Sequence, residues 1–122
     1  MYIMTLYKEN IMNAEILRGF TDAIILNCLL ESDSYGYKIS RSIIEKTNSK
    51  MDIKDATIYL AFKRMEKDKL ITSYWSDNNI GARRKYYKIT DEGKRYLKEK
   101  KKEWKKNKDI LDILLLGEDY ER

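Results

Sequence analysis

The strongest constraint on the fold is a change of hydrophobic pattern near residue 70 of the 122-residue chain. Before this point apolar residues recur at helical spacing. After it, two segments rich in β-branched and aromatic residues, 71–75 and 84–89, flank a turn-rich stretch. A long charged segment with helical character follows. The order predicts a mainly α fold with a small β-hairpin, a winged helix-turn-helix followed by a long C-terminal dimerisation helix.

Three helices are predicted before the hairpin, at 14–30, 35–46 and 55–68. Asn13 is the expected cap of the first, and Asp33 or Ser34 is the expected cap of the second. The second half of the first helix is apolar nearly all round, so it needs cover on more than one side. In so small a protein, we expect another subunit to provide part of that cover.

The last helix is predicted at 91–116, with Thr90 as its cap, and would be roughly 40 Å long. Leu97, Trp104 and Leu111 recur every seven residues along a lysine-rich surface. A helix with so narrow an apolar seam needs a partner to lie against, which predicts a homodimer. The predicted organisation is an N-terminal extension at 1–12, a DNA-binding domain at 13–90, and a dimerisation helix with its tail at 91–122.

The composition argues against an enzyme. Histidine is absent, and the sequence has no glycine-rich phosphate loop, no metal-spaced cysteine pair and no nucleophile with a partner base, so we expect no catalytic site, no metal site and no cofactor. Cys28 lies in an apolar run and is expected to be buried and unreactive. A single cysteine cannot form an internal disulfide, which fits a cytoplasmic protein.

No membrane partner is expected. The longest apolar run is far shorter than the roughly 18 to 20 residues that span a bilayer, and residues 1–10 lack the pattern of a signal peptide. The formal net charge of +5 instead favours an anionic partner.

Two segments carry the candidate contacts to double-stranded DNA. The helix at 55–68 would enter the major groove, with Lys54 beside it. The hairpin's second strand opens with three cations that could follow phosphates or enter the minor groove. The candidates are Lys54, Thr57, Tyr59, Lys63, Arg83, Arg84 and Lys85.

Each candidate has a simpler interpretation. Tyr59 could be a core aromatic, and Arg64 could pair with Glu66 or another surface acid. The cations of the hairpin could form a solvated edge that discourages strand pairing.

Three segments in order resemble the PadR family of transcriptional regulators. Residues 56–71 are similar to the family's recognition helix, 35–39 to its preceding helix, and 81–93 to its wing and the entry to its last helix. The resemblance implies a homodimeric DNA-binding regulator, most simply a repressor, on a pseudo-palindromic operator. It adds Tyr35 and Lys38 to the candidate DNA contacts. Lys69 and Ala82 depart from the pattern, since glycine is usual at the first position and proline or glycine at the second.

The short C-terminal part resembles the small branch typified by the multidrug-binding regulator LmrR. That likeness implies a flat pore at the dimer centre, where a planar aromatic ligand lies beside Trp104. Lys108 falls where the drug-binding relative carries an acid, and Lys101 replaces an apolar pore residue. Lysines there would repel cations, so we expect a neutral or anionic planar ligand, or none. The matching pore or dimer-interface positions are Ile16, Gly19, Ala23, Trp104, Lys108 and Leu111.

Two alternatives stay open from the sequence alone. Trp104 could serve only in dimer packing. The winged helix could also dock proteins instead of DNA, with the long helix as a scaffold.

Overall fold

The computed structural model describes residues 19–76 and 83–117. The predicted extension at 1–12, Asn13, Ile16 and Ala82 lie outside the described residues. The described elements are α3 (Thr21–Glu31), α4 (Gly36–Lys46), α5 (Asp55–Lys67), β1 (Ile71–Ser76), β2 (Arg84–Ile89), α6 (Asp91–Leu111) and a π-helical turn at Asp112–Leu116.

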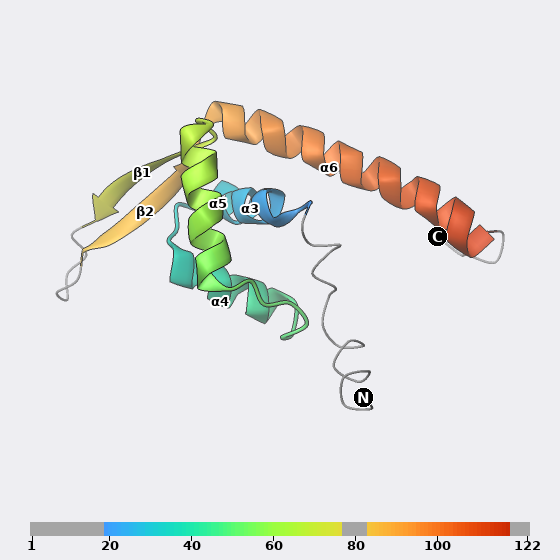
Figure 1. The fold of residues 1–122 in the computed structure, drawn as a ribbon, viewed down its shortest axis with the longest axis horizontal. Helices are drawn as coiled ribbons and strands as arrows, with labels where there is room; N and C mark the ends of the chain where they lie inside the picture. The colour runs from blue at the N-terminus through green and yellow to red at the C-terminus, as the bar shows by residue number, and fades with distance from the viewer. Residues whose placement is uncertain (1–18, 77–82, 118–122) are drawn as a thin grey trace.

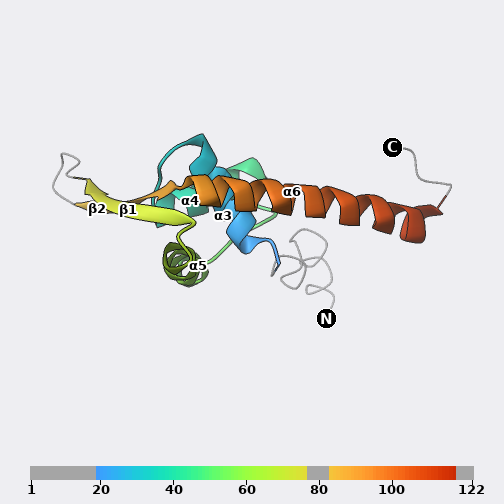
Figure 2. The ribbon, with the colours of Figure 1, turned by 90° about the horizontal axis from the view of Figure 1, so that it is seen from above.

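The hairpin and α6 leave the compact part of the molecule in opposite directions (Figure 1). α3, α4 and α5 lie between them, and α5 stands to one side when the molecule is seen from above (Figure 2). This arrangement confirms the predicted fold class, a mainly helical winged helix-turn-helix with a long C-terminal helix.

α3 is the central element of the core. Ile25 and Leu26 are completely buried, and the helix contacts α5, β2 and α6. Much of the cover that we expected from a second subunit therefore comes from the same chain. The other fully buried side chains include Phe62, Ile39, Ile58, Met65 and Ile71.

The first helix begins later than predicted within the described residues. Gly19 and Phe20 form a turn, and α3 starts at Thr21. The expected caps of the second helix are also wrong. Tyr35 occupies the cap position of α4 without a side-chain hydrogen bond.

Asp33 and Ser34 have other roles. The Asp33 carboxylate accepts a hydrogen bond of 2.7 Å from the Tyr74 hydroxyl. Ser34 exchanges backbone hydrogen bonds of 3.2 and 2.7 Å with Tyr87. These contacts fasten the segment before α4 to both strands of the hairpin, to β1 through Tyr74 and to β2 through Tyr87.

The two strands form an antiparallel pair in which Ile71 faces Ile89 and Tyr74 faces Tyr86. On the inner face, Tyr87 stacks on Phe62 of α5 with ring centroids 3.8 Å apart. The hairpin is therefore held to the helix that precedes it.

Two short connections fix where α5 ends and α6 begins. Lys69 has a φ of 63°, the left-handed conformation that the family's usual glycine would adopt easily. Thr90 caps α6 as predicted, accepting a 3.0 Å hydrogen bond from the Gly93 backbone N–H. α6 then runs to Leu111, and its last turn widens into the π-helical turn. Among the described helices, none combines the length and the apolar content needed to cross a bilayer.

Candidate functional site

The outward face of α5 carries most of the predicted contacts from this helix. Ile58, Phe62 and Met65 are buried on its inner side. Tyr59 is 61% exposed, so its interpretation as a core aromatic is wrong. Three further candidates are also exposed on or beside this helix, Lys54, Thr57 and Lys63.

Arg64 connects α5 to α3 through an ion pair, so its guanidinium is already engaged and is not an open contact on the outward face of α5. Its guanidinium binds the Asp22 carboxylate, with Nε 3.2 Å from Oδ2, and this hydrogen-bonded pairing raises the pKa of Arg64 above its usual value. Arg64 therefore pairs with a surface acid as expected, although not with Glu66. The Glu66 carboxylate accepts a 2.6 Å hydrogen bond from Ser73 of β1.

The cations of the hairpin lie over aromatic rings. Arg83 lies 5.2 Å from the centroid of the Trp75 ring. Lys85 lies 5.7 Å from the centroid of Tyr87. Such cation–π contacts restrain long side chains that would otherwise sample many rotamers. They hold positive charge at defined points of the hairpin. A solvated edge that only discourages strand pairing would not need its cations held in this way.

Arg84 and Tyr35 connect the hairpin to α4. The Arg84 guanidinium lies 4.5 Å from the centroid of the Tyr35 ring, and Tyr35 contacts Tyr86 edge to face at 5.2 Å. Tyr86 stacks in turn on Tyr74 at 5.8 Å. Tyr35 thus supports the hairpin, and Lys38 lies exposed one helical turn away.

Sequence reasoning missed Trp75 as a candidate. The side chain is 56% exposed and shares a hairpin face with Ser73, the residue bonded to α5. Alternation along the strand could have placed Trp75 on this face. Its exposure depends on how the hairpin packs on α5, a tertiary contact that the local pattern does not give.

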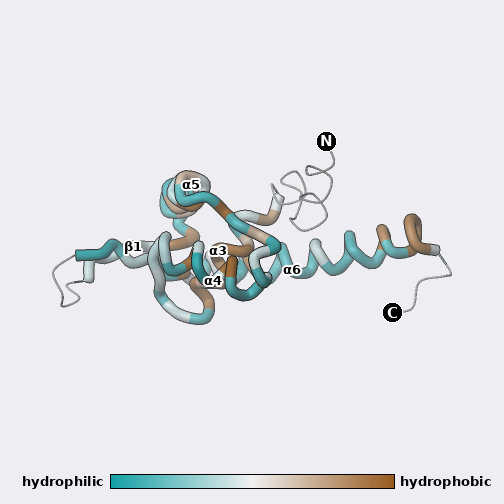
Figure 3. Tube along the Cα trace, turned by 90° about the horizontal axis from the view of Figure 1, so that it is seen from below, coloured by the Kyte–Doolittle hydropathy of each residue, from teal (hydrophilic) through white to brown (hydrophobic). Residues whose placement is uncertain are grey.

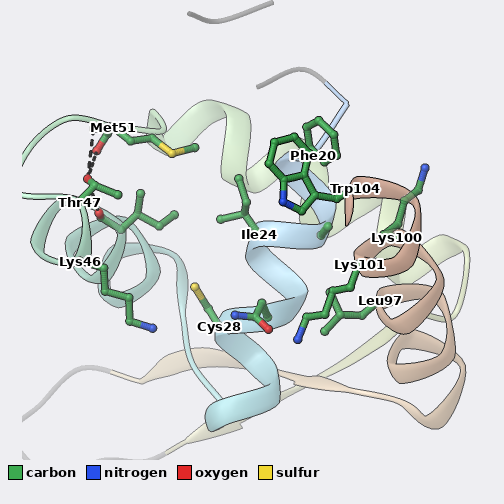
Figure 4. Close-up of a pocket in the computed structure, with 13 residues that line it drawn as sticks. Phe20, Ile24, Cys28, Lys46, Thr47, Met51, Leu97, Lys100, Lys101 and Trp104 are labelled. Carbon is green, nitrogen blue, oxygen red and sulfur yellow. Dashed lines mark hydrogen bonds between the residues drawn. The ribbon is translucent and has the colours of Figure 1, made fainter. Parts of the chain in front are cut away.

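A second feature is a pocket of about 390 Å³ between α3, α6 and the C-terminal end of α4 (Figure 4). Phe20 and Trp104 form one wall, with ring centroids 5.3 Å apart in an edge-to-face contact. The lining residues are Phe20, Ala23, Ile24, Asn27, Cys28, Ile43, Lys46, Thr47, Met51, Leu97, Lys100, Lys101 and Trp104.

Cys28 lines this pocket and is half-buried against the core, so it is less covered than the buried thiol that the sequence predicted. Burial nevertheless raises the pKa of its thiol. A raised pKa keeps the reactive thiolate scarce at neutral pH, in line with the expected low reactivity.

The structure brings only part of the predicted pore set together. Ala23 and Trp104 line the pocket, as does Lys101, whereas the described residues Gly19, Lys108 and Leu111 do not. Lys108 binds Asp112 at 3.0 Å, at the start of the π-helical turn that follows α6. Sequence reasoning did not include Phe20 or Met51, which reach the pocket from segments that flank helices. In the described part of the chain, no cluster of three or more acidic or cysteine side chains could hold a metal ion.

Comparisons with known proteins agree with this architecture. Residues 25–99 match the model of the transcriptional regulator PadR-like family. A relative from Lysinibacillus sphaericus, named only as an uncharacterized protein X, is 47% identical over 104 residues, covering 85% of this chain and 95% of that protein.

Solved structures extend the likeness to three dimensions. A transcriptional regulator from Clostridium thermocellum, Cth-833, is 42% identical with a TM-score of 0.80, covering 86% of this chain and 99% of that one. Bacillus subtilis PadR in complex with operator DNA is 25% identical with a TM-score of 0.59, covering 65% of this chain and 45% of that one. Together with the family match, these likenesses show that the chain belongs to the PadR-like family of transcriptional regulators.

Proposed function

We propose that this protein represses transcription by binding a pseudo-palindromic operator as a homodimer. The observation that carries the proposal is that two surfaces occur together. α5 presents an exposed face with polar candidate contacts, and the hairpin holds its cations on aromatic rings. α5 would read the major groove and the hairpin would contact the adjacent backbone or minor groove. A relative, Bacillus subtilis PadR, is known in complex with operator DNA.

Dimerisation is supported by the far end of α6. Apolar residues follow one another there (Figure 3), and Leu114 and Leu115 are 72% and 76% exposed in the single chain. Exposed leucines gathered on a protruding helix are typical of a protein–protein interface. A chain with one cysteine needs no disulfide for this assembly, which suits a protein of the reducing cytoplasm.

Regulation by a ligand is the third part of the proposal. A planar aromatic molecule beside Trp104 would relieve repression by favouring one arrangement of the two DNA-binding heads over another. The edge-to-face pair of Phe20 and Trp104 offers aromatic surface for such a molecule. This role follows the drug-binding branch that the C-terminal part resembles.

The test measures fluorescence anisotropy of a labelled duplex taken from upstream of the gene. We expect binding that weakens with salt by a log–log slope of about −0.9 per phosphate neutralised. Arg83→Ala should weaken binding about fivefold on specific and unrelated duplexes alike, because it removes a backbone contact.

Lys105→Ala is the matched control for Arg83→Ala. It removes one positive charge from the exposed middle of α6, far from the hairpin, and should leave the affinity nearly unchanged. Duplex binding that is absent even at low salt would contradict the proposal and favour a protein-docking module. Equal losses from the two variants would place the DNA contact elsewhere.

A further inference from the structure

The outward face of α5 has an apolar residue at its centre. Leu60 is 63% exposed, although it lies two positions from both Ile58 and Phe62, which are buried in the core. Two positions along an α-helix correspond to a rotation of about 200°, so Leu60 points away from the core. A single exposed leucine is common on protein surfaces, and what distinguishes this one is its place on α5.

Two polar contacts, one on each flank of α5, fix the direction in which this face points. On one flank, Arg64 Nε donates a 3.2 Å hydrogen bond to Asp22 Oδ2 of α3. On the other, the Glu66 carboxylate accepts the 2.6 Å hydrogen bond from the Ser73 hydroxyl of β1. A rotation of α5 about its own axis would break these contacts. Leu60 is therefore held in its outward orientation.

The surroundings of Leu60 indicate what this face binds. Ala56 lies one turn before it on the same face, and Lys63 and Lys67 follow it, all of them exposed. The lysines suit a polyanion. Even with the exposed ring of Tyr59 beside it, the apolar patch is too small for a stable protein interface, which buries about 800 Å² on each partner. The edge of a base pair in the major groove fits both the size and the charge of this face.

The chemistry of a leucine side chain limits what it can recognise in the major groove. It offers neither a hydrogen-bond donor nor an acceptor. The C5-methyl of thymine is the apolar group that base pairs present there, and contact with it removes apolar surface from water. Against the polar edge of another base, the same side chain would displace water without replacing its hydrogen bonds. Leu60 would therefore favour thymine.

We propose that Leu60 selects one thymine in each half-site of the operator by contact with its C5-methyl group. The inference rests on the proposed binding of duplex DNA and names a base that the outward face of α5 prefers. Two chains related by a two-fold axis would apply this preference once in each half-site. Lys63 and the hairpin cations would supply affinity, whereas Leu60 would supply discrimination between bases.

The test replaces each thymine of the bound duplex in turn by deoxyuridine, which keeps the base pairing and removes only the methyl group. The duplex is the one from upstream of the gene, and its affinity for the full-length protein is measured by fluorescence anisotropy. We expect one position in each half-site at which the replacement weakens binding about fourfold, the effect of losing one buried methyl group.

Leu60→Ala assigns that contact to its residue. The position is exposed and alanine favours the helix, so the variant should fold, but the shorter side chain does not reach the methyl group. The deoxyuridine penalty at this position should fall to within about 1.5-fold. Lys63→Ala is the matched comparison on the same face. It should weaken binding to the thymine and deoxyuridine duplexes equally, so that the fourfold penalty is kept.

A gain of contact tests the methyl group itself. Cytosine in place of this thymine should weaken binding. Replacing it by 5-methylcytosine, which carries a methyl group at the same ring position, should then strengthen binding about fourfold. The gain should be absent in Leu60→Ala. The measurements on the unaltered protein test the methyl preference independently of how any variant folds.

Three results would overturn the inference while leaving DNA binding in place. They are a duplex in which no deoxyuridine weakens binding, a penalty that persists unchanged in Leu60→Ala, and a 5-methylcytosine that binds no better than cytosine. Absence of duplex binding even at low salt would instead overturn the proposed function, and this inference with it. The two failures are therefore distinguishable.

Discussion

Lys69 shows most directly how one residue bears on the fold. It lies in the connection from α5 to β1 with a φ of 63°, a conformation that costs a side-chain-bearing residue free energy. Its carbonyl accepts a 2.8 Å hydrogen bond from the Thr90 hydroxyl, the same residue that caps α6. The strained position therefore joins the end of α5 to the start of the long helix and has to be kept.

We predict that Lys69→Gly raises the free energy of unfolding by about 1 kcal/mol, since glycine adopts a positive φ without the Cβ penalty. Urea unfolding at fixed protein concentration measures it. Lys67→Gly, in the helical last turn of α5, is the control and should lower the same free energy by about 0.5–1 kcal/mol. A loss of stability in Lys69→Gly would show that the lysine side chain contributes more than the backbone strain costs.

The structure explains why a glycine, Gly93, stands in the first turn of α6. A Cβ at this position would overlap the Leu70 carbonyl oxygen and lie 2.8 Å from Ile89 Cγ1. The first turn of α6 can therefore pack against the start of β1 only if this position lacks a side chain. The sequence placed Gly93 in the segment that resembles the family's helix entry, but the close approach that requires it is a tertiary contact.

At the scale of elements, the sequence predicted those whose signals are local. α5, the hairpin and the start of α6 follow from a helical stripe, two alternating segments and a threonine cap. The cap of α4 was predicted wrongly because Asp33 and Ser34 form hydrogen bonds with the hairpin instead. Polar residues next to a helix favour capping locally, but partners distant in sequence decided their role here.

The two candidate sites also differ in how far the sequence could predict them. The outward face of α5 could be predicted because its inner stripe is periodic. The pocket could be predicted only in part, because its wall joins α3 and α6 across more than 70 positions of the chain. Phe20 in a turn and Met51 in a loop carry no periodic signal that would assign them to it.

The contact between α4 and the hairpin yields a prediction at this scale. Tyr35 presents its ring to Arg84 and Tyr86, so its aromatic face, more than its hydroxyl, should hold the hairpin in place. We expect Tyr35→Leu to weaken operator binding about fivefold and Tyr35→Phe to leave it within about twofold, by the anisotropy assay. A large loss in Tyr35→Phe would instead indicate that the hydroxyl itself contacts phosphate.

At the scale of the whole molecule, charge and apolar surface are separated. The cationic hairpin lies at one end, and the exposed leucines that follow α6 lie at the other (Figures 1 and 3). A single chain offers one copy of α5, the proposed recognition helix, and leaves the leucines in water. Pairing two chains through the apolar ends would cover those leucines and present two DNA-binding heads, as a pseudo-palindrome requires.

Leu114→Glu tests this assembly. The leucine is 72% exposed in one chain, so a glutamate there should leave the chain folded while placing a charge in the apolar contact between chains. We expect the dimer dissociation constant to rise about tenfold or more, measured by size-exclusion chromatography with light scattering. Lys105→Ala also makes the charge more negative by one on the same side of the molecule, and should leave the dimer intact.

The same variant separates assembly from recognition. Binding to a full pseudo-palindrome should weaken in Leu114→Glu, whereas binding to a single half-site should not, because α5 and the hairpin are untouched. The salt dependence should fall toward the half-site value, since fewer phosphates are neutralised per bound molecule. If Leu114→Glu stays dimeric and binds the full operator normally, the chains pair through another surface and the apolar end of α6 has a different partner.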